Sequence, residues 1–466
     1  MLKSLKIQNF KGWKDTGKIK LSPITLFFGT NSSGKSSIGQ FLVMLKQTMD
    51  SSDRKAVFYP GDKNSAVQLG SFREMVFHRD VSNKIKFKYC WSLSDKEKFN
   101  IEDSKSEKTY PVNTINFSAE TGQDEKENNY LHLYNLTYSL SNDNEKQFSI
   151  SMKKKQDKKS FYEIECDNNY KLVREMGRVW KSPDPRKFYA FPDEIMAYYQ
   201  NANFVQDLNF YHEKLFKNMY YLGPLRTKTE RLYTWTKIEP ESVGNDGQHA
   251  IAAILSAKNR KINYKYKART KSFETIIIEE LKKMGLIEDF RVKEIIEQRQ
   301  DYEVKIKTKG SGDWVDLPDV GFGISQVLPV LVQCFYAPQN SIILIEQPEI
   351  HLHPSAQSAL ADVMIDVINS GENGVPRNIQ LIIETHSEHF LRRLQRRIVE
   401  DEMLKDKVSA YFADITESPA SLNELEIDLY GNIRNWPKDF FGDIASDVIA
   451  QDMIIAEKRM KMKQES

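Results

Sequence analysis

The 466-residue sequence predicts an α/β fold with a mixed central sheet, an added antiparallel β layer and a helical lobe. Three short apolar runs, at residues 24–28, 342–345 and 379–383, are rich in β-branched residues and typical of buried strands. A glycine or a glutamate follows each run. Between the first two runs, residues 81–174 contain short stretches that alternate apolar and polar side chains, which indicates half-buried antiparallel strands.

The first apolar run leads into a glycine-rich loop, Gly29-Thr-Asn-Ser-Ser-Gly-Lys-Ser-Ser37, and a helical pattern follows. In this G-x-x-x-x-G-K-[ST] pattern, several backbone N–H groups point at one phosphate chain and the helix N-terminus adds partial positive charge. Lys35 is expected to reach the β- and γ-phosphates, and the Ser36 hydroxyl to bind Mg²⁺. The sequence therefore predicts a nucleoside triphosphate site rather than a Gly/Ser surface turn. The loop residues expected to bind the nucleotide are Asn31, Ser32, Ser33, Gly34, Lys35, Ser36 and Ser37.

The other two apolar runs supply groups that complete such a site. The second run ends in Glu346, as in sites where a strand beside the phosphate-loop strand points its terminal carboxylate at Mg²⁺. The acid in such sites is usually Asp. The third run ends in Glu384-Thr-His-Ser387. We expect His386 to hold the γ-phosphate or the attacking water, rather than to be an isolated surface histidine.

A second glycine loop, Gly321-Phe-Gly-Ile-Ser-Gln326, enters an apolar helix. The N-terminus of such a helix is another anion site. One nucleotide does not need two unrelated glycine-rich phosphate-binding loops in one chain. The two loops are explained if each ATP is sandwiched between the phosphate loop of one protomer and this loop of a second. Gly323 and Ser325 would then bind the nucleotide of the partner.

Composition limits the class of protein. No apolar run is long enough to cross a bilayer, and the N-terminus has no signal-peptide core. The three cysteines, Cys90, Cys166 and Cys334, form no metal or disulfide pattern, so we expect a cytoplasmic protein with no membrane association. Lys+Arg 67 against Asp+Glu 65 gives a net charge of +2, which neither demands nor excludes a nucleic-acid partner.

The order of these motifs resembles that of the ABC-type ATPases of the SMC/RecF/OLD branch, a group of AAA-family ATPases. The opening Leu5-Lys-Ile-Gln-Asn-Phe-Lys-Gly12 is similar to the first strand of that branch. Ile345-Glu-Gln-Pro-Glu-Ile-His-Leu-His-Pro354 resembles its I-E-[EQ]-P-E-x-x-L-H-P box. Residues 384–387 match its switch-histidine segment, and residues 321–326 stand where it keeps the signature loop. The resemblance implies an ABC-type P-loop ATPase head that uses ATP and Mg²⁺.

One position departs from the family pattern. The residue after the acid of the second strand is usually Glu in this family, where it polarises the attacking water, and here it is Gln347. An amide can orient water but cannot take its proton, so we expect tight ATP binding and slow hydrolysis. Glu349 is a candidate substitute. The expected catalytic residues are Gln347, Glu349 and His386, and the expected metal ligands are Ser36 and Glu346.

The patterns along the chain, taken with this resemblance, predict a division into four parts. An N-terminal part of the ATPase lobe is followed by the antiparallel β insertion, the helical lobe and a C-terminal part of the ATPase lobe. These parts span residues 1–80, 81–174, 175–300 and 301–466. No repeat and no sustained heptads are present, so no long coiled coil is expected.

Several local patterns within these parts predict particular elements. Residues 272–284 and 288–297 have the pattern of amphipathic helices, and residues 302–307 that of a strand. The aromatic-rich stretch at 188–220 is expected to belong to the core rather than to form a base-stacking platform. His351 and His353 alternate as two metal ligands do, but no further ligand lies near them in the sequence.

Two classes of function follow from the resemblance. Some members of the branch serve in bacterial anti-phage defence, such as the Septu ATPase, which works with an HNH nuclease. This favours an ATP-gated regulator that forms an ATP-sandwiched homodimer or higher oligomer and controls a partner effector, which we expect to be a nuclease.

The alternative is a RecF-like ATPase that binds DNA in repair or recombination. It is favoured by Arg392, Arg393, Arg396 and Arg397 on one expected helix and by lysines at 153–155 and 158–159, unless these residues only form a solvated face. An ordinary P-loop kinase is disfavoured by the paired glycine loops and His386.

Overall fold

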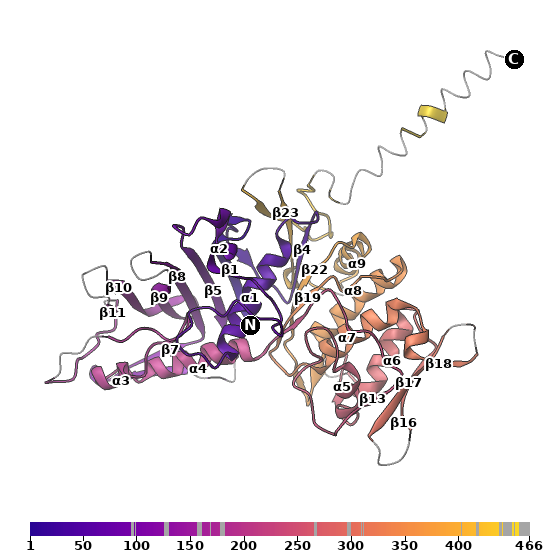
Figure 1. Ribbon diagram of the computed structural model, residues 1–466, viewed down its shortest axis with the longest axis horizontal. Helices are drawn as coiled ribbons and strands as arrows, with labels where there is room; N and C mark the ends of the chain where they lie inside the picture. The colour runs from indigo at the N-terminus through magenta and orange to yellow at the C-terminus, as the bar shows by residue number, and fades with distance from the viewer. Residues whose placement is uncertain are drawn as a thin grey trace.

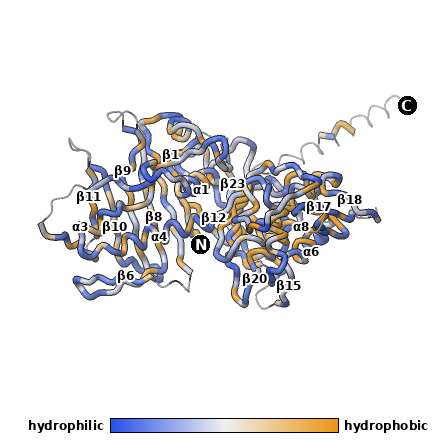
Figure 2. Tube along the Cα trace, turned by 60° about the horizontal axis from the view of Figure 1, so that its bottom comes forward, coloured by the Kyte–Doolittle hydropathy of each residue, from blue (hydrophilic) through white to orange (hydrophobic). Residues whose placement is uncertain are grey.

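The computed structural model has two lobes side by side (Figure 1). It describes residues 1–94, 97, 99–124, 130–155, 161–167, 169–177, 182–264, 268–295, 300–308, 310, 312–401, 403–415, 419–437, 440, 450–451 and 453–455. Two apolar cores lie inside the lobes. Figure 2 shows hydrophobic stretches inside both, around β10 (Glu145–Lys155) on one side and α8 (Pro354–Asn369) on the other. Among the described residues, no helix is both long and apolar enough to span a bilayer.

A six-stranded mixed sheet positions the predicted site. Its spatial order is β12 (Met219–Leu222), β19 (Ile342–Glu346), β22 (Gln380–Glu384), β4 (Ile24–Gly29), β23 (Val408–Asp414) and β24 (Ser421–Glu424). All neighbours are parallel except β23 and β24, which confirms the predicted mixed sheet. One expectation was wrong, because β22 separates β19 from the phosphate-loop strand β4. β19 and β22 are buried throughout, so their apolar sequences do not specify their order.

An eight-stranded antiparallel sheet forms the other lobe. Its order is β11 (Phe161–Cys166), β10, β9 (Leu131–Asn142), β8 (Thr114–Gln123), β5 (Ile85–Ser92), β1 (Leu2–Phe10) and β2 (Trp13–Asp15), with β3 (Ile19–Lys20) also on β1. The predicted antiparallel layer is therefore present. It shares its sheet with the N-terminal strands, because Ile7 of β1 pairs with Phe87 of β5. The four-part division of the chain stays a prediction.

Helices cover the mixed sheet on both faces. The core shared with the antiparallel sheet contains residues of α1 (Lys35–Asp50) and α4 (Phe204–Lys217), together with Phe188 and Phe191, which confirms that the aromatic stretch is core. The other core contains residues of α5 (Ala250–Ser256), α6 (Phe273–Lys283), α7 (Phe322–Tyr336), α8 and α9 (Glu388–Val399). Residues of the segment 175–300 contribute to both cores.

A small sheet corrects one helix prediction. Residues 288–297 were expected to be helical, but β16 (Asp289–Glu294) is a strand that pairs along β17 (Asp301–Lys307); residues 296–297 lie outside the described chain. The side chain of Phe290 is buried in this sheet, and pairing with β17 overrides the local helical pattern. The helix α6 and the strand β17 are as predicted. The same sheet contains β13 (Tyr233–Thr234) and β18 (Trp314–Asp316).

The remaining elements are short. They are α2 (Phe72–Met75), α3 (Ile195–Tyr198), the 3-10 helices η1 (Phe77–Arg79), η3 (Leu317–Asp319) and η4 (Lys405–Lys407), and the strand pairs β6 (Phe99–Asp103) with β7 (Lys108–Val112), β14 (Lys261–Ile262) with β15 (Lys271–Ser272), and β20 (Gly371–Glu372) with β21 (Val375–Pro376).

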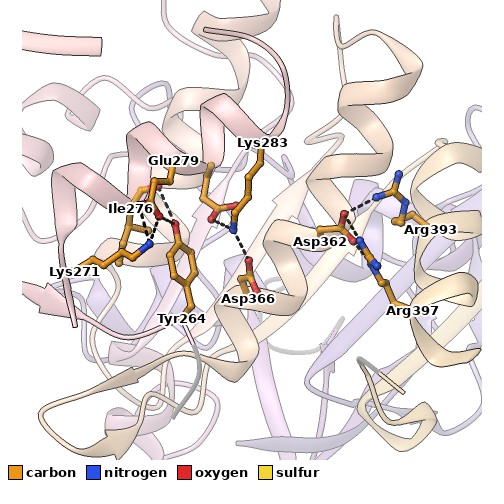
Figure 3. Close-up of polar contacts among 10 residues, drawn as sticks. Tyr264, Lys271, Ile276, Glu279, Lys283, Asp362, Asp366, Arg393 and Arg397 are labelled. Carbon is orange, nitrogen blue, oxygen red and sulfur yellow. Dashed lines mark hydrogen bonds and ion pairs between the residues drawn. The ribbon is translucent and has the colours of Figure 1, made fainter. Parts of the chain in front are cut away.

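Polar contacts fasten α8 to a helix on each side (Figure 3). Asp362 of α8 accepts hydrogen bonds from Arg393 at 2.6 Å and Arg397 at 2.7 Å, both on α9. On the other side, Lys283 of α6 donates to Asp366 of α8 at 3.0 Å. These charge-assisted bonds link α6 and α9 to α8.

A buried histidine joins α4 to the antiparallel sheet. The Tyr138 hydroxyl has one hydrogen and donates it to the Tyr189 carbonyl at 2.9 Å, so it accepts from His212 Nδ1 at 2.7 Å. The other ring nitrogen, Nε2, then accepts from the Tyr89 hydroxyl at 2.6 Å. Burial lowers the pKa of His212 well below its ordinary value of 6.5, so the ring is neutral in the folded protein.

This histidine predicts a loss of stability in mild acid. The unfolded chain binds a proton at His212 below about pH 6.5, whereas the folded chain does not, so the free energy of unfolding falls as pH drops, by up to about 1.4 kcal/mol per pH unit. His212→Gln keeps a donor and an acceptor but does not titrate. Thermal midpoints at pH 7.5 and 5.5 should therefore differ less for His212→Gln than for the parent. Equal differences would contradict the prediction.

Candidate nucleotide site

The phosphate loop curls at two glycines. Gly29 and Gly34 have φ of +143° and +87°, conformations that side chains rarely adopt. A Cβ on Gly29 would also collide with the carbonyl of Ala413 in β23. The loop therefore needs glycine at both positions to turn from β4 into α1.

The predicted residues of the phosphate loop differ in their burial. Ser33 and Ser37 are buried, and the Ser37 hydroxyl accepts from Trp13 Nε1 at 2.9 Å, so these serines brace the loop from inside. Buried Lys35 donates from Nζ to the carbonyls of Gly29 at 3.0 Å and Thr30 at 2.7 Å, and burial lowers its pKa. Four predicted residues stay accessible: Asn31, Ser32, Gly34 and Ser36.

Two carboxylates end neighbouring strands at this edge of the sheet, and one of them contacts the phosphate loop. Glu346 and Glu384 are register partners at the ends of β19 and β22. The Ser36 hydroxyl donates to Glu384 Oε1 at 3.0 Å, whereas Glu346 Oε1 accepts from the Tyr221 hydroxyl at 2.9 Å. Burial, and then the negative charge of Glu384, raises the pKa of Glu346 to about 7. The sequence analysis named Glu346 as a candidate metal ligand but did not include Glu384 among the site residues. Glu384 also directly follows a buried apolar run, and this signal could have identified it.

The segment after β12 also reaches this edge and was missed as part of the site. Arg226, 9% exposed, donates from Nη2 to the Glu346 carbonyl at 3.2 Å. Its Nε and Nη1 have no hydrogen-bond partner among the described residues. Burial lowers the pKa of this guanidinium to about 10, and the negative charge of Glu346 opposes that shift. Further along, Arg231 forms two hydrogen bonds with Asp319, just before the second glycine loop.

The three predicted catalytic residues lie close to these acids. The backbone N–H of Gln347 donates to the Glu384 carbonyl at 2.8 Å, and Gln347 has a positive φ of 45°. Glu349 is buried, and its Oε1 accepts from the backbone N–H of His386 at 2.7 Å. Burial raises the pKa of Glu349. The His386 side chain is exposed, and desolvation and the charge of Lys35 lower its pKa.

The second glycine loop presents backbone rather than the predicted serine. Ser325 is 9% exposed, and its hydroxyl donates to the Phe322 carbonyl in its own helix α7 at 2.7 Å. Gly323 is partly exposed and packs closely on the His351 carbonyl, which would lie 3.0 Å from an added Cβ. Gly321 and the Phe322 side chain, 73% exposed, are the accessible parts of the loop. The nucleotide contacts of Gly323 and Ser325 stay predictions.

The oxygen donors at this edge fit Mg²⁺, which prefers carboxylate, hydroxyl and phosphate oxygens. Among the described residues, no group of three or more His, Cys, Asp or Glu side chains forms a complete metal site. A magnesium ion at this edge would need phosphate oxygens of the nucleotide as additional ligands. His353 instead caps α8, because its Nδ1 accepts from the Ser355 backbone N–H at 3.3 Å, which disfavours a His351–His353 metal site.

Comparison with known proteins gives matches over most of the chain. Residues 1–391 match the family described as AAA ATPase domain, and residues 404–451 a family described as a protein of unknown function, DUF3696. An "ATP/GTP phosphatase" of Helicobacter pylori is 22% identical over 404 residues, which cover 86% of this chain and 90% of that protein.

Two solved structures with similar folds are heads of SMC proteins. An SMC head bound to the C-terminal winged-helix domain of ScpA has a TM-score of 0.43 at 12% identity and covers 91% of this chain and 98% of that chain. The SMC head of Thermotoga maritima has a TM-score of 0.39 at 10% identity and covers 91% of this chain and 99% of that chain.

The buried position of Arg226 predicts a large effect on stability. Arg226→Leu removes the cation beside the buried acids and should lower the free energy of unfolding by about 3 kcal/mol. Arg231→Leu, in the same segment, removes an exposed ion pair and should change the free energy of unfolding much less. Thermal and urea unfolding of both variants measure this difference. Equal losses would show that Arg226 does not compensate the acids.

Proposed function

Because this chain belongs to the family of AAA ATPase domains, it is an ATPase, and we propose that ATP closes two copies of it face to face. In this arrangement the second glycine loop of one copy contacts the γ-phosphate held by the phosphate loop of the other. The closed state regulates a partner effector, a nuclease, in bacterial anti-phage defence. The observation that carries the proposal is the exposed second loop, where Gly321 is the N-cap residue of α7 and no side chain caps the helix.

Exposed apolar side chains in the second loop and in the segment that follows β12 support pairing of two copies. Phe322 lies in the loop itself, and Leu225, Leu232 and Ile238 are strongly exposed in the segment that Arg231 ties to Asp319. Such exposed apolar side chains are typical of interaction surfaces when they lie together. A second copy seated over the nucleotide would cover them.

The acids support slow hydrolysis. Gln347 stands where the family has its catalytic Glu and cannot accept a proton. Glu349 already accepts a hydrogen bond from the His386 backbone through Oε1, so it holds the histidine segment in place. Ser36 and Glu346 are proposed to hold Mg²⁺, which would neutralise phosphate charge, and His386 is proposed to contact the γ-phosphate. Such a site favours long-lived closure over rapid turnover.

The RecF-like alternative loses support from the structure, because its basic helix is neutralised. All four arginines of α9 form ion pairs: Arg392 with Glu388, Arg393 with Asp362, Arg396 with Glu400, and Arg397 with Asp362 and Glu400. Lys153 and Lys155 pair with Glu165 and Glu163, and residues 158–159 lie outside the described chain. Salt-dependent DNA binding by the isolated protein would favour the alternative. Co-purification with the product of a neighbouring gene would favour the regulator.

Closure over ATP predicts a change in mass. The parent should form a dimer or higher oligomer with ATP and Mg²⁺, as measured by size-exclusion chromatography with light scattering. Phe322→Glu places a charge in the interface and should keep ATP binding but stay monomeric, whereas Lys35→Ala should fail to bind ATP. Phe210→Glu, at an exposed phenylalanine of α4, is the matched control and should assemble like the parent. Assembly of Phe322→Glu and Lys35→Ala like the parent would exclude the sandwich.

Because Gln347 replaces the usual catalytic Glu, restoring a glutamate at this position should increase the rate of ATP hydrolysis. Gln347→Glu restores a group that can take the proton of water, so single-turnover hydrolysis should accelerate by about 100-fold. Gln347→Ala is the control for loss of the amide. The hypothesis fails if the parent already turns over as fast as Gln347→Glu and only Glu349→Gln abolishes hydrolysis, because Glu349 would then be the base.

A further inference from the structure

Two acidic side chains are buried next to each other at the carboxyl edge of the mixed sheet. Glu346 is 8% exposed and Glu384 is 9% exposed, and they end adjacent strands at the same register position. Two carboxylates this close disfavour each other's ionisation, and burial adds to that effect. A second buried acid at this position is unfavourable unless a cation compensates it.

The hydrogen bonds of Glu384 leave one oxygen unused. Its Oε1 accepts from the Ser36 hydroxyl, the group that is expected to bind Mg²⁺. Its Oε2 is buried and has no hydrogen-bond partner among the described residues. A buried carboxylate oxygen without a hydrogen-bond partner destabilises the folded protein. Its position beside an expected metal ligand therefore points to a cation that binds there.

The spacing of the oxygens agrees with one octahedral ion. Mg²⁺ binds oxygen at about 2.0–2.1 Å in octahedral geometry, so two adjacent ligand oxygens lie about 2.9 Å apart. Ser36 Oγ and Glu384 Oε1 are 3.0 Å apart. These two oxygens are held together by a hydrogen bond, and at this separation both can bind one Mg²⁺ without a large movement.

We propose that Glu384 is a second carboxylate ligand of the ATPase magnesium ion, next to Ser36 and together with Glu346. The ion would receive two protein carboxylates, one hydroxyl and phosphate oxygens of ATP. Two carboxylates bind a divalent cation more strongly than one, and the ion removes their mutual repulsion. The inference concerns the ATP site of a single copy and does not depend on closure of two copies or on the partner effector.

The test is the affinity of the full-length protein for Mn²⁺, measured by electron paramagnetic resonance with saturating ATP. Glu384→Gln can still accept a hydrogen bond from Ser36, so the loop keeps its contact while the ligand charge is lost. We expect the Mn²⁺ affinity to fall by about 10- to 100-fold, as it should for Glu346→Gln. ATP affinity in the presence of EDTA and the thermal midpoint without metal should not fall.

A matched control separates ligation from general charge. Glu349→Gln removes one negative charge from an equally buried acid that contacts the His386 backbone instead of Ser36. Its Mn²⁺ affinity should stay close to that of the parent. The proposal is overturned if Glu384→Gln binds Mn²⁺ like the parent, or if Glu349→Gln loses as much affinity as Glu384→Gln. Because light scattering measures closure separately, failure of either proposal leaves the other testable.

Discussion

Three buried glutamates share one edge of the mixed sheet, and the rest of the site is arranged around their negative charge. Ionised carboxylates are unfavourable in a protein interior unless cations or hydrogen bonds compensate them. Here Lys35 lies near Glu384, the Arg226 guanidinium bonds the backbone of Glu346, and Glu349 accepts a backbone N–H. The phosphate loop, the segment after β12 and the histidine segment are therefore held together by the same acids.

The segment from β12 to Arg231 connects the two glycine loops within one copy. At its start, the Tyr221 hydroxyl orients the Glu346 carboxylate. At its end, Arg231 bonds Asp319 and Asp316 immediately before the second loop. Hydrogen bonds at its two ends thus connect the acid edge, through this segment, to the residues just before the loop that is proposed to meet the partner copy.

Predictions from the sequence were correct for elements whose signal lies in residues close together in the chain. They were wrong for features that depend on contacts between residues far apart in the chain. The phosphate loop, α7 and the alternating strands of the antiparallel layer were found because glycine, helix-start and period-two signals are local. The order of β19, β22 and β4 was wrong, because strands buried on both faces have the same apolar composition. The strand β16 was expected to be a helix, since only its pairing with β17 distinguishes the two.

The sequence by itself determined that this chain has a phosphate loop, two acid-terminated buried strands and a second glycine-rich helix start, because backbone curling and strand burial impose those residue types. Only the tertiary structure decided which side chains meet. Placing β22 between β19 and β4 brings Glu384 to Ser36 and leaves Glu346 to Tyr221. Residues more than a hundred positions apart in the chain acquire such contacts through sheet order, which long-range packing sets and local pattern does not encode.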